Sequence, residues 1–75
     1  MYKVINWLTR QKYLNWEGAL IEDIKTKEKY ITNGVFVWKA TKEKLQQCEV
    51  VDTIDLEKLI NRWNKHQGYS ELIIE

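Results

Sequence analysis

The chain has little of several residue types on which recognisable chemistry depends. Its 75 residues contain one cysteine, one histidine and three glycines. A single cysteine excludes an internal disulfide, which fits a reducing compartment, and we expect a cytoplasmic protein. One cysteine and one histidine cannot supply the ligands of a Cys/His zinc site. Three scattered glycines are too few to build a phosphate-binding loop or a dinucleotide-binding fingerprint.

Long apolar runs and an excess of charge of one sign are also missing. No apolar stretch approaches about 18 residues, and the N-terminus lacks a basic region followed by an apolar run, so we predict neither a membrane span nor a signal peptide. The net charge of +1 gives no support to a globally basic nucleic-acid binder or to an acidic mimic of DNA. Proline is absent and ten of the 12 basic residues are lysines. With the many isoleucines and asparagines, this usage is typical of an AT-rich bacterial or phage genome.

Catalytic side chains are scarce. Cys48 and His66 are the only candidates for a thiol–imidazole pair. We expect Cys48 to follow a helix C-terminus, where the helix dipole disfavours a thiolate, and His66 to cap the last turn of a second helix. The acidic residues Asp52, Asp55 and Glu57 lack the spacing of a calcium loop and are interpreted as helix N-terminal electrostatics. We therefore predict a protein that is not an enzyme and that uses no metal and no cofactor.

Aromatic residues, by contrast, are abundant: four Trp, four Tyr and one Phe. Each can bury on the order of 150–250 Å², which compensates for the small core of so short a chain. The strongest β-forming stretch spans residues 30–38. Read as one strand with a period of two, it sorts its apolar residues into two sets, Ile31, Val35 and Val37 against Tyr30, Phe36 and Trp38. Neither set is polar, so a second layer, a partner or a curled sheet must cover the face that does not pack on the core.

A competing interpretation breaks the same stretch at Asn33-Gly34, the strongest two-residue hairpin signal in the chain. A turn there would give two short strands, residues 29–32 and 35–39, whereas the long strand, which we favour, makes Gly34 a bulge. The choice decides where two groups of lysines lie. In one long strand they are about 30 Å apart, and in a hairpin they approach each other. These groups are Lys25, Lys27 and Lys29, and Lys39, Lys42 and Lys44.

The other elements follow from periodicity and capping. We predict a strand over residues 2–8, a bent strand over 13–24 in which Gly18 marks a bulge or a close backbone approach, and a short helix over 42–48 capped by Thr41. An extended piece over 49–54, an amphipathic helix over 55–67 and a terminal strand over 69–75 complete the chain. Residues 1–75 are thus predicted to form one small α+β domain. Its sheet is mainly antiparallel, with three to five strands in the order β-β-β-α-(β)-α-β, and one main amphipathic helix packs on it.

Our leading hypothesis is a small, non-catalytic protein-interaction module. It would bind another protein, or a second copy of itself as a homodimer, through an aromatic sheet face or through a strand edge. Size and composition favour an accessory protein or inhibitor from a phage or mobile element that acts on a host protein. The predicted contact residues are Tyr30, Phe36 and Trp38, with Lys29 and Lys39 at the rim.

The alternative hypothesis is binding of single-stranded nucleic acid, with the same aromatic rings as a stacking platform between lysines. It predicts an affinity that falls steeply with salt, because neutralised phosphates release counterions. Docking of a protein through an apolar face predicts a weak dependence on salt.

Overall fold

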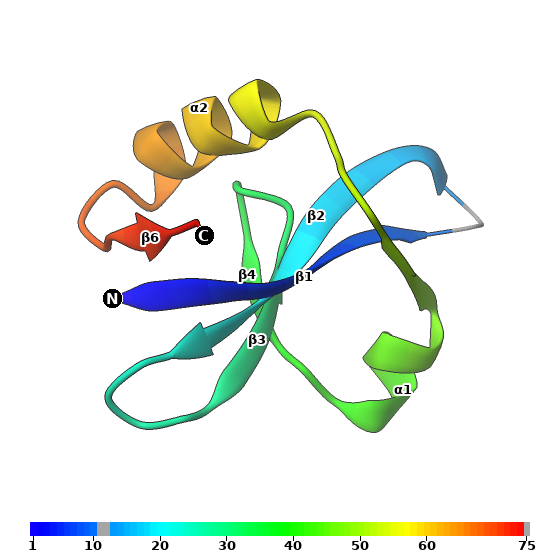
Figure 1. Ribbon diagram of the computed structural model, residues 1–75, viewed down its shortest axis with the longest axis horizontal. Coiled ribbons are helices and arrows are strands. Elements are labelled where there is room, and N and C mark those ends of the chain that lie inside the picture. Colours follow the sequence, from blue (N-terminus) through cyan, green and yellow to red (C-terminus); the bar gives the residue numbers. More distant parts are fainter. Residues whose placement is uncertain (11–12, 75) are drawn as a thin grey trace.

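The structure is a computed structural model that describes residues 1–10 and 13–74. It confirms an α+β architecture with a mostly antiparallel sheet and two helices (Figure 1). In chain order the elements are β1 (Tyr2–Arg10), β2 (Tyr13–Asp23), β3 (Lys29–Thr32), β4 (Val37–Lys39), α1 (Lys42–Gln46), β5 (Cys48–Val51), α2 (Leu56–His66) and β6 (Leu72–Ile73).

The sheet has six strands, one more than the largest number predicted. Five of them follow the order β4-β3-β2-β1-β5 and pair antiparallel. The sixth, β6, pairs in parallel with the start of β1, where Tyr2 lies opposite Leu72. The extra strand arises because the central aromatic stretch splits into two strands, β3 and β4. The predicted terminal strand over 69–75 is reduced to the two residues of β6.

One face of the sheet is covered by α2, the amphipathic helix that the sequence predicts. Asp55 caps it by accepting a hydrogen bond from the Lys58 backbone N–H at 3.2 Å. Its buried residues Leu59 and Trp63 pack in one cluster with Ile21 of β2. Tyr2, Trp7 and Tyr30 extend this cluster at its edge. This cluster is the larger of the two cores.

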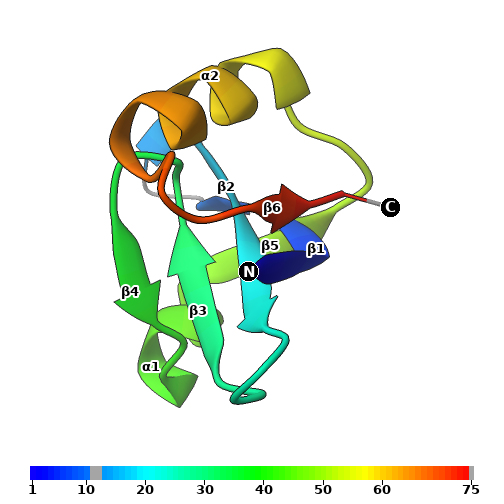
Figure 2. The same cartoon turned by 90° about the vertical axis from the view of Figure 1, so that its left-hand side faces the viewer.

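The opposite face carries a second, smaller core of Leu8, Leu20 and Ile31. Side chains of α1 and its neighbours pack against it, including Leu45 and Cys48. Figure 2 shows α2 beyond the tip of the β3–β4 hairpin and α1 near the base of that hairpin. The chain thus places its own elements against both apolar faces.

The prediction of one long, bulged strand over residues 30–38 is wrong, because four residues, 33–36, turn the chain between β3 and β4. In the resulting register Ile31 lies opposite Trp38, and Tyr30 lies opposite Lys39. Directly paired residues of an antiparallel ladder share a face of the sheet. Tyr30 and Trp38 therefore lie on opposite faces.

Gly18 lies at a close backbone approach. A Cβ atom there would lie 2.1 Å from the backbone oxygen of Thr32 in the neighbouring strand. The register shifts of the β1–β2 ladder fall instead between Val4 and Asn6 and between Thr9 and Arg10. Glycine is thus required at position 18 for space, so that β2 and β3 can lie against each other.

Candidate functional site

The structure divides the predicted contact residues between two places. Phe36 and Trp38 remain together, with ring centroids 5.8 Å apart. Tyr30 is on the other face, where its ring meets that of Tyr2 edge-on at 5.9 Å. The prediction that the three rings form one surface is therefore wrong, because the hairpin turn reverses the alternation on which it rested.

Tyr30 is held in place by its own neighbours. Its hydroxyl donates a hydrogen bond of 2.6 Å to Oε2 of Glu28. This bond, reinforced by desolvation and by the charge of Glu28, raises the pKa of Tyr30 from 10.0 to about 12. Tyr30 is thus partly buried against the core under α2, on the face opposite Phe36 and Trp38, and its role as a contact residue stays a prediction.

Phe36 is the most exposed aromatic ring near the hairpin, with 60% of its surface accessible. It belongs to the loop between β3 and β4 and leans on Trp38, which is partly buried on the smaller core. We call these two residues the aromatic corner. An exposed large ring beside a half-buried one is typical of the anchors of protein interfaces.

Hydrogen bonds within the β3–β4 loop fix the backbone that carries Phe36. The fully buried Thr32 hydroxyl donates to the Phe36 carbonyl at 2.7 Å and accepts from the Gly34 N–H at 2.9 Å. The Asn33 side-chain oxygen accepts from the N–H groups of Val35 and Phe36 at 3.0 and 2.9 Å. The loop is therefore an Asx turn closed by a buried hydroxyl, and it replaces the two-residue turn that Asn33-Gly34 suggests.

The helix α2 holds the same loop from outside. Gly34 has φ +93° and packs so closely that a Cβ atom would lie 2.7 Å from Cβ of Arg62. Gln67, at the C-terminal cap of the helix, donates from its side-chain amide to the Val35 carbonyl at 2.9 Å. The loop thus has no room to shift toward α2, and the position of Phe36 is set by the packing of the whole hairpin.

Beside the aromatic corner a groove of about 460 Å³ runs between α1 and the sheet. Its walls include two tryptophans, Trp16 of β2 and Trp38 of β4. Ile31 of β3, the strand that lies between β2 and β4 in the sheet, also lines it. A cation stands over each tryptophan ring: the Arg10 guanidinium 5.8 Å from the Trp16 centroid, and the Lys44 ammonium 6.0 Å from that of Trp38. Each distance is within the range of a cation–π contact.

Trp16 is a site residue that was not predicted, because periodicity indicates only that it belongs to the strand over residues 13–24. It lines the groove at the side of the smaller core. The signal in the sequence is Gly18, two positions along the same strand and on the same face. A Cβ atom at Gly18 would lie 2.7 Å from the Cη2 atom of Trp16, so the glycine makes room for the ring.

Lysines gather at the end of the hairpin near α1. Tyr30, next to Lys29, pairs with Lys39 across the hairpin, and Ala40 donates its backbone N–H to the Lys29 carbonyl at 3.1 Å. The turn thus brings Lys29 of the first lysine group near Lys39 of the second, which a long strand would separate. We call the exposed lysines of this region the lysine rim, and they are Lys29, Lys39, Lys42 and Lys44. Two exposed glutamates lie among them, Glu43 and, next to Lys29, Glu28.

Cys48 borders the groove as a half-buried thiol. Burial raises its pKa, and the nearby Arg10 charge offsets this only in part. Its sulfur donates to the Lys44 carbonyl at the end of α1. Over residues 1–10 and 13–74 no three His, Cys, Asp or Glu side chains gather as a metal site would need.

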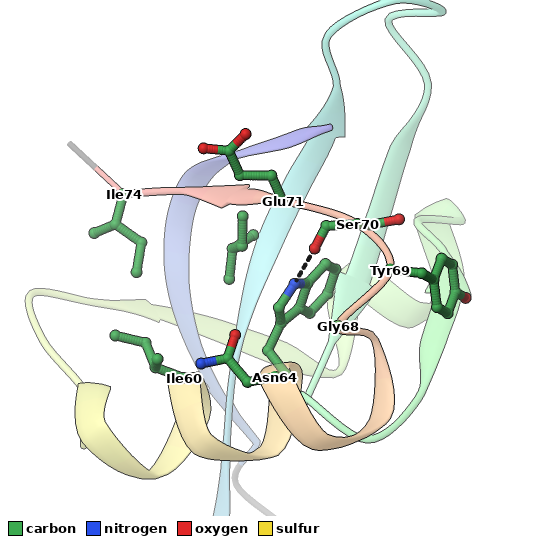
Figure 3. A pocket seen from close by; sticks show the side chains of 9 residues that line it. Ile60, Asn64, Gly68, Tyr69, Ser70, Glu71 and Ile74 are labelled. Carbon is green, nitrogen blue, oxygen red and sulfur yellow. Dashed lines mark hydrogen bonds between the residues drawn. The ribbon is translucent and has the colours of Figure 1, made fainter.

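A second concavity, of about 470 Å³, lies between α2 and β6 (Figure 3). Ile60 of α2 and Ile74 beyond β6 supply apolar walls, and the Asn64 amide lies at its edge. The indole N–H of Trp63 is already bonded to the Ser70 carbonyl at 2.9 Å. Glu71 is the only charged residue that lines it, so the described lining offers no pair of groups for acid–base chemistry.

In the part of the chain that the structure describes, no helix is both long and apolar enough to span a membrane. Comparisons with protein-family models, with curated proteins and with solved structures found no match for this chain. The features from which its function can be inferred are therefore the aromatic corner, the groove and the lysine rim.

Proposed function

We propose that this chain is a small, non-catalytic protein-interaction module that docks on another protein through its aromatic corner and the adjoining groove. The single observation that carries the proposal is Phe36, which is 60% exposed although its loop is closed by buried and cross-element hydrogen bonds. An apolar ring presented on a rigid backbone loses little conformational entropy on binding. Such preorganisation is a property of binding surfaces.

The surroundings of the aromatic corner support this proposal. Its apolar centre is bordered by a groove with tryptophan walls and by the lysine rim. An aromatic centre with charges at its border is the usual composition of a protein interface. Within this proposal, the small size and the lysine-rich, proline-free composition favour an accessory protein or inhibitor from a phage or mobile element, with a host protein as its partner.

Single-stranded nucleic acid is the second candidate, and the observation in its favour is the cation over each tryptophan of the groove. Aromatic rings combined with positive charge are the means by which such proteins bind bases and phosphates. The same cations, however, occupy ring faces on which a base would stack. Arg10 also donates to the side-chain carbonyl of Gln47, which ties it to the protein. For these reasons we favour a protein partner.

The direct test is affinity capture from cells of the natural source with three forms of the chain: the wild type, Phe36→Ala and Val50→Ala. Val50 is a matched control because it is 66% exposed but lies on β5. We expect one protein to be retained by the wild type and by Val50→Ala and to be lost with Phe36→Ala. The free energy of unfolding of both variants should lie within about 0.5 kcal/mol of the wild-type value, since they change exposed side chains. Equal retention by all three forms would refute the proposal.

The nucleic-acid candidate is tested with a labelled oligothymidine by fluorescence anisotropy at low and at physiological salt. Binding that weakens steeply with salt and requires Trp38 would favour it over a protein partner. We expect no specific binding at physiological salt.

A further inference from the structure

The aromatic corner lies on an edge strand whose backbone is oriented for pairing. The strand β4 is the last in the order of the sheet. Because Ala40 donates to the Lys29 carbonyl and hydrogen-bonded pairs alternate along an antiparallel ladder, Trp38 bonds inward to its partner Ile31. By the same alternation Val37 and Lys39 direct their N–H groups to the outer edge. An extended chain placed there would find backbone donors at a two-residue spacing.

The side chains on this edge define what such a chain would carry. On the groove face, the residue that joins the sheet beside Trp38 would contact the aromatic corner, and Phe36 has 60% of its surface available for it. That residue is expected to be apolar. The lysine rim places four lysines around the same edge against two glutamates, Glu28 and Glu43, so positive charge predominates there. The charges that complement it are acidic.

We propose that the aromatic corner takes an extended, acidic segment of a partner protein, which adds to β4 as a further strand of the sheet. Main-chain hydrogen bonds to Val37 and Lys39 hold the segment, an apolar residue packs on Phe36 and Trp38, and flanking carboxylates face the lysine rim. Recognition of this kind separates affinity, which comes from the backbone, from specificity, which comes from the side chains. This inference rests on the proposed function, for which it names the partner's chemistry.

Two features of β4 agree with strand addition. It has only three residues, and lysines at such an edge prevent indiscriminate pairing with other sheets. An acidic segment neutralises the same lysines, so it can pair with β4 where other strands are disfavoured. The Thr41 N–H donates to the Lys39 carbonyl at 2.9 Å, which ends the available edge at that residue. The added strand is therefore short.

The test is a titration of the isotope-labelled protein, followed by amide resonances, with the capped peptide Glu-Glu-Val-Phe-Val-Glu-Glu as the probe. We expect the Val37 and Lys39 amides to shift and their hydrogen exchange to slow about tenfold at peptide concentrations up to about 1 mM, a range suited to weak binding. A peptide with lysine in place of each glutamate should bind at least about tenfold more weakly. No shift of these two amides, or equal binding of both peptides, would overturn the inference.

Two further peptides separate strand addition from side-chain docking. Each carries N-methyl groups on alternate residues, one on the odd and one on the even positions, so that one of them cannot donate to β4 while all side chains are kept. Loss of binding by one of the two is expected. If both bind like the parent and binding still needs Phe36, strand addition fails but the proposed function stands. If the Val37 and Lys39 shifts persist in Phe36→Ala with unchanged affinity, the aromatic corner, and with it the proposed function, fails.

The charge contribution is tested with Lys39→Glu and with the control Lys58→Glu. Lys39 belongs to the edge strand β4 itself, whereas Lys58 is exposed on the helix α2. We expect Lys39→Glu to lower the affinity for the acidic peptide about fivefold and Lys58→Glu to leave that affinity unchanged. The opposite pattern would place the peptide elsewhere on the molecule.

Discussion

At the scale of single residues, Thr32 connects the fold to the candidate site. It is a buried polar residue of the core, and its hydroxyl both donates and accepts within the loop that carries Phe36. This hydroxyl stabilises the loop, because the Gly34 N–H and the Phe36 carbonyl would each lose a hydrogen bond without it. The geometry of an exposed ring is thus set by a hydroxyl that solvent cannot reach.

Replacement of Thr32 by valine keeps the shape of the side chain and removes this hydroxyl. We expect a loss of about 1–3 kcal/mol in the free energy of unfolding, because the Gly34 N–H and the Phe36 carbonyl lose a partner. Urea unfolding measures it. Thr32→Ser keeps the hydroxyl and should cost clearly less. An equal cost for both variants would mean that the methyl group, which only Thr32→Ser removes, contributes as much to stability as the two hydrogen bonds, and would contradict their leading role.

The Tyr30 hydroxyl gives a prediction on pH. Its folded pKa of about 12 exceeds the ordinary value of 10.0, so the stability it contributes is fully present below pH 10.0 and is lost as the pH rises toward 12. Tyr30→Phe lacks this titration. The difference in stability between the two forms should shrink between pH 10.0 and about 12, as measured by unfolding at fixed temperature. A difference that stays constant over that range would contradict the hydrogen bond to Glu28 as its cause.

At the scale of elements, α2 organises the larger core and also locates the hairpin. Trp63 is 2% exposed, meets the ring of Tyr2 at 5.7 Å and donates its indole N–H to the Ser70 carbonyl. Through these contacts one residue joins α2, the start of β1 and the turn that leads to β6. The position of Ser70 also limits where the terminal strand can lie.

Trp63→Phe tests this role. The phenyl ring keeps most of the apolar contact but cannot donate to the Ser70 carbonyl and leaves a void where the second ring was. We expect a loss of about 1–3 kcal/mol in the free energy of unfolding, and faster amide exchange at Leu72 and Ile73. Asn64→Ala, next on the same helix and exposed, should change stability by less than about 0.5 kcal/mol. Unchanged exchange in β6 would mean that its pairing with β1 holds without the indole.

At the scale of the whole molecule, the fold shows what covers the second apolar face that the sequence predicts. The smaller core is packed by α1 and by the start of β5. Exposed large apolar side chains of the described residues come from separate segments rather than from one sheet face, and they are Met1, Ile5, Phe36, Val50, Ile60 and Tyr69. A second copy is therefore not needed to cover the sheet.

We accordingly expect the pure protein to be a monomer of 9.1 kDa across a dilution series measured by light scattering. A dimer that persists on dilution but dissociates in Phe36→Ala would show that the aromatic corner binds a second copy. A dimer that is unaffected by that variant would point to the edge strands β5 or β6 instead.

Elements whose signals are local could be predicted from the amino-acid sequence. The stripe of Leu56, Leu59, Ile60 and Trp63 with the cap Asp55 predicts α2 almost to the residue, because a period of 3.6 and a capping side chain act within a few residues. The strands β1 and β2 were predicted for the same reason, whereas the long strand that we favoured would have kept the two lysine groups apart. Phe36 and Trp38 were recognised as a pair from their spacing.

The position of the turn in the central stretch, and the face on which each aromatic ring lies, depend instead on contacts between distant parts of the chain. The turn depends on the burial of Thr32 and on Gly34 meeting Arg62 and Gln67 meeting Val35, contacts between residues about 30 positions apart. One turn of the chain reassigns every side chain that follows it, since alternation restarts at the loop. Tyr30 therefore packs against the core under α2, and Trp16 lines the groove.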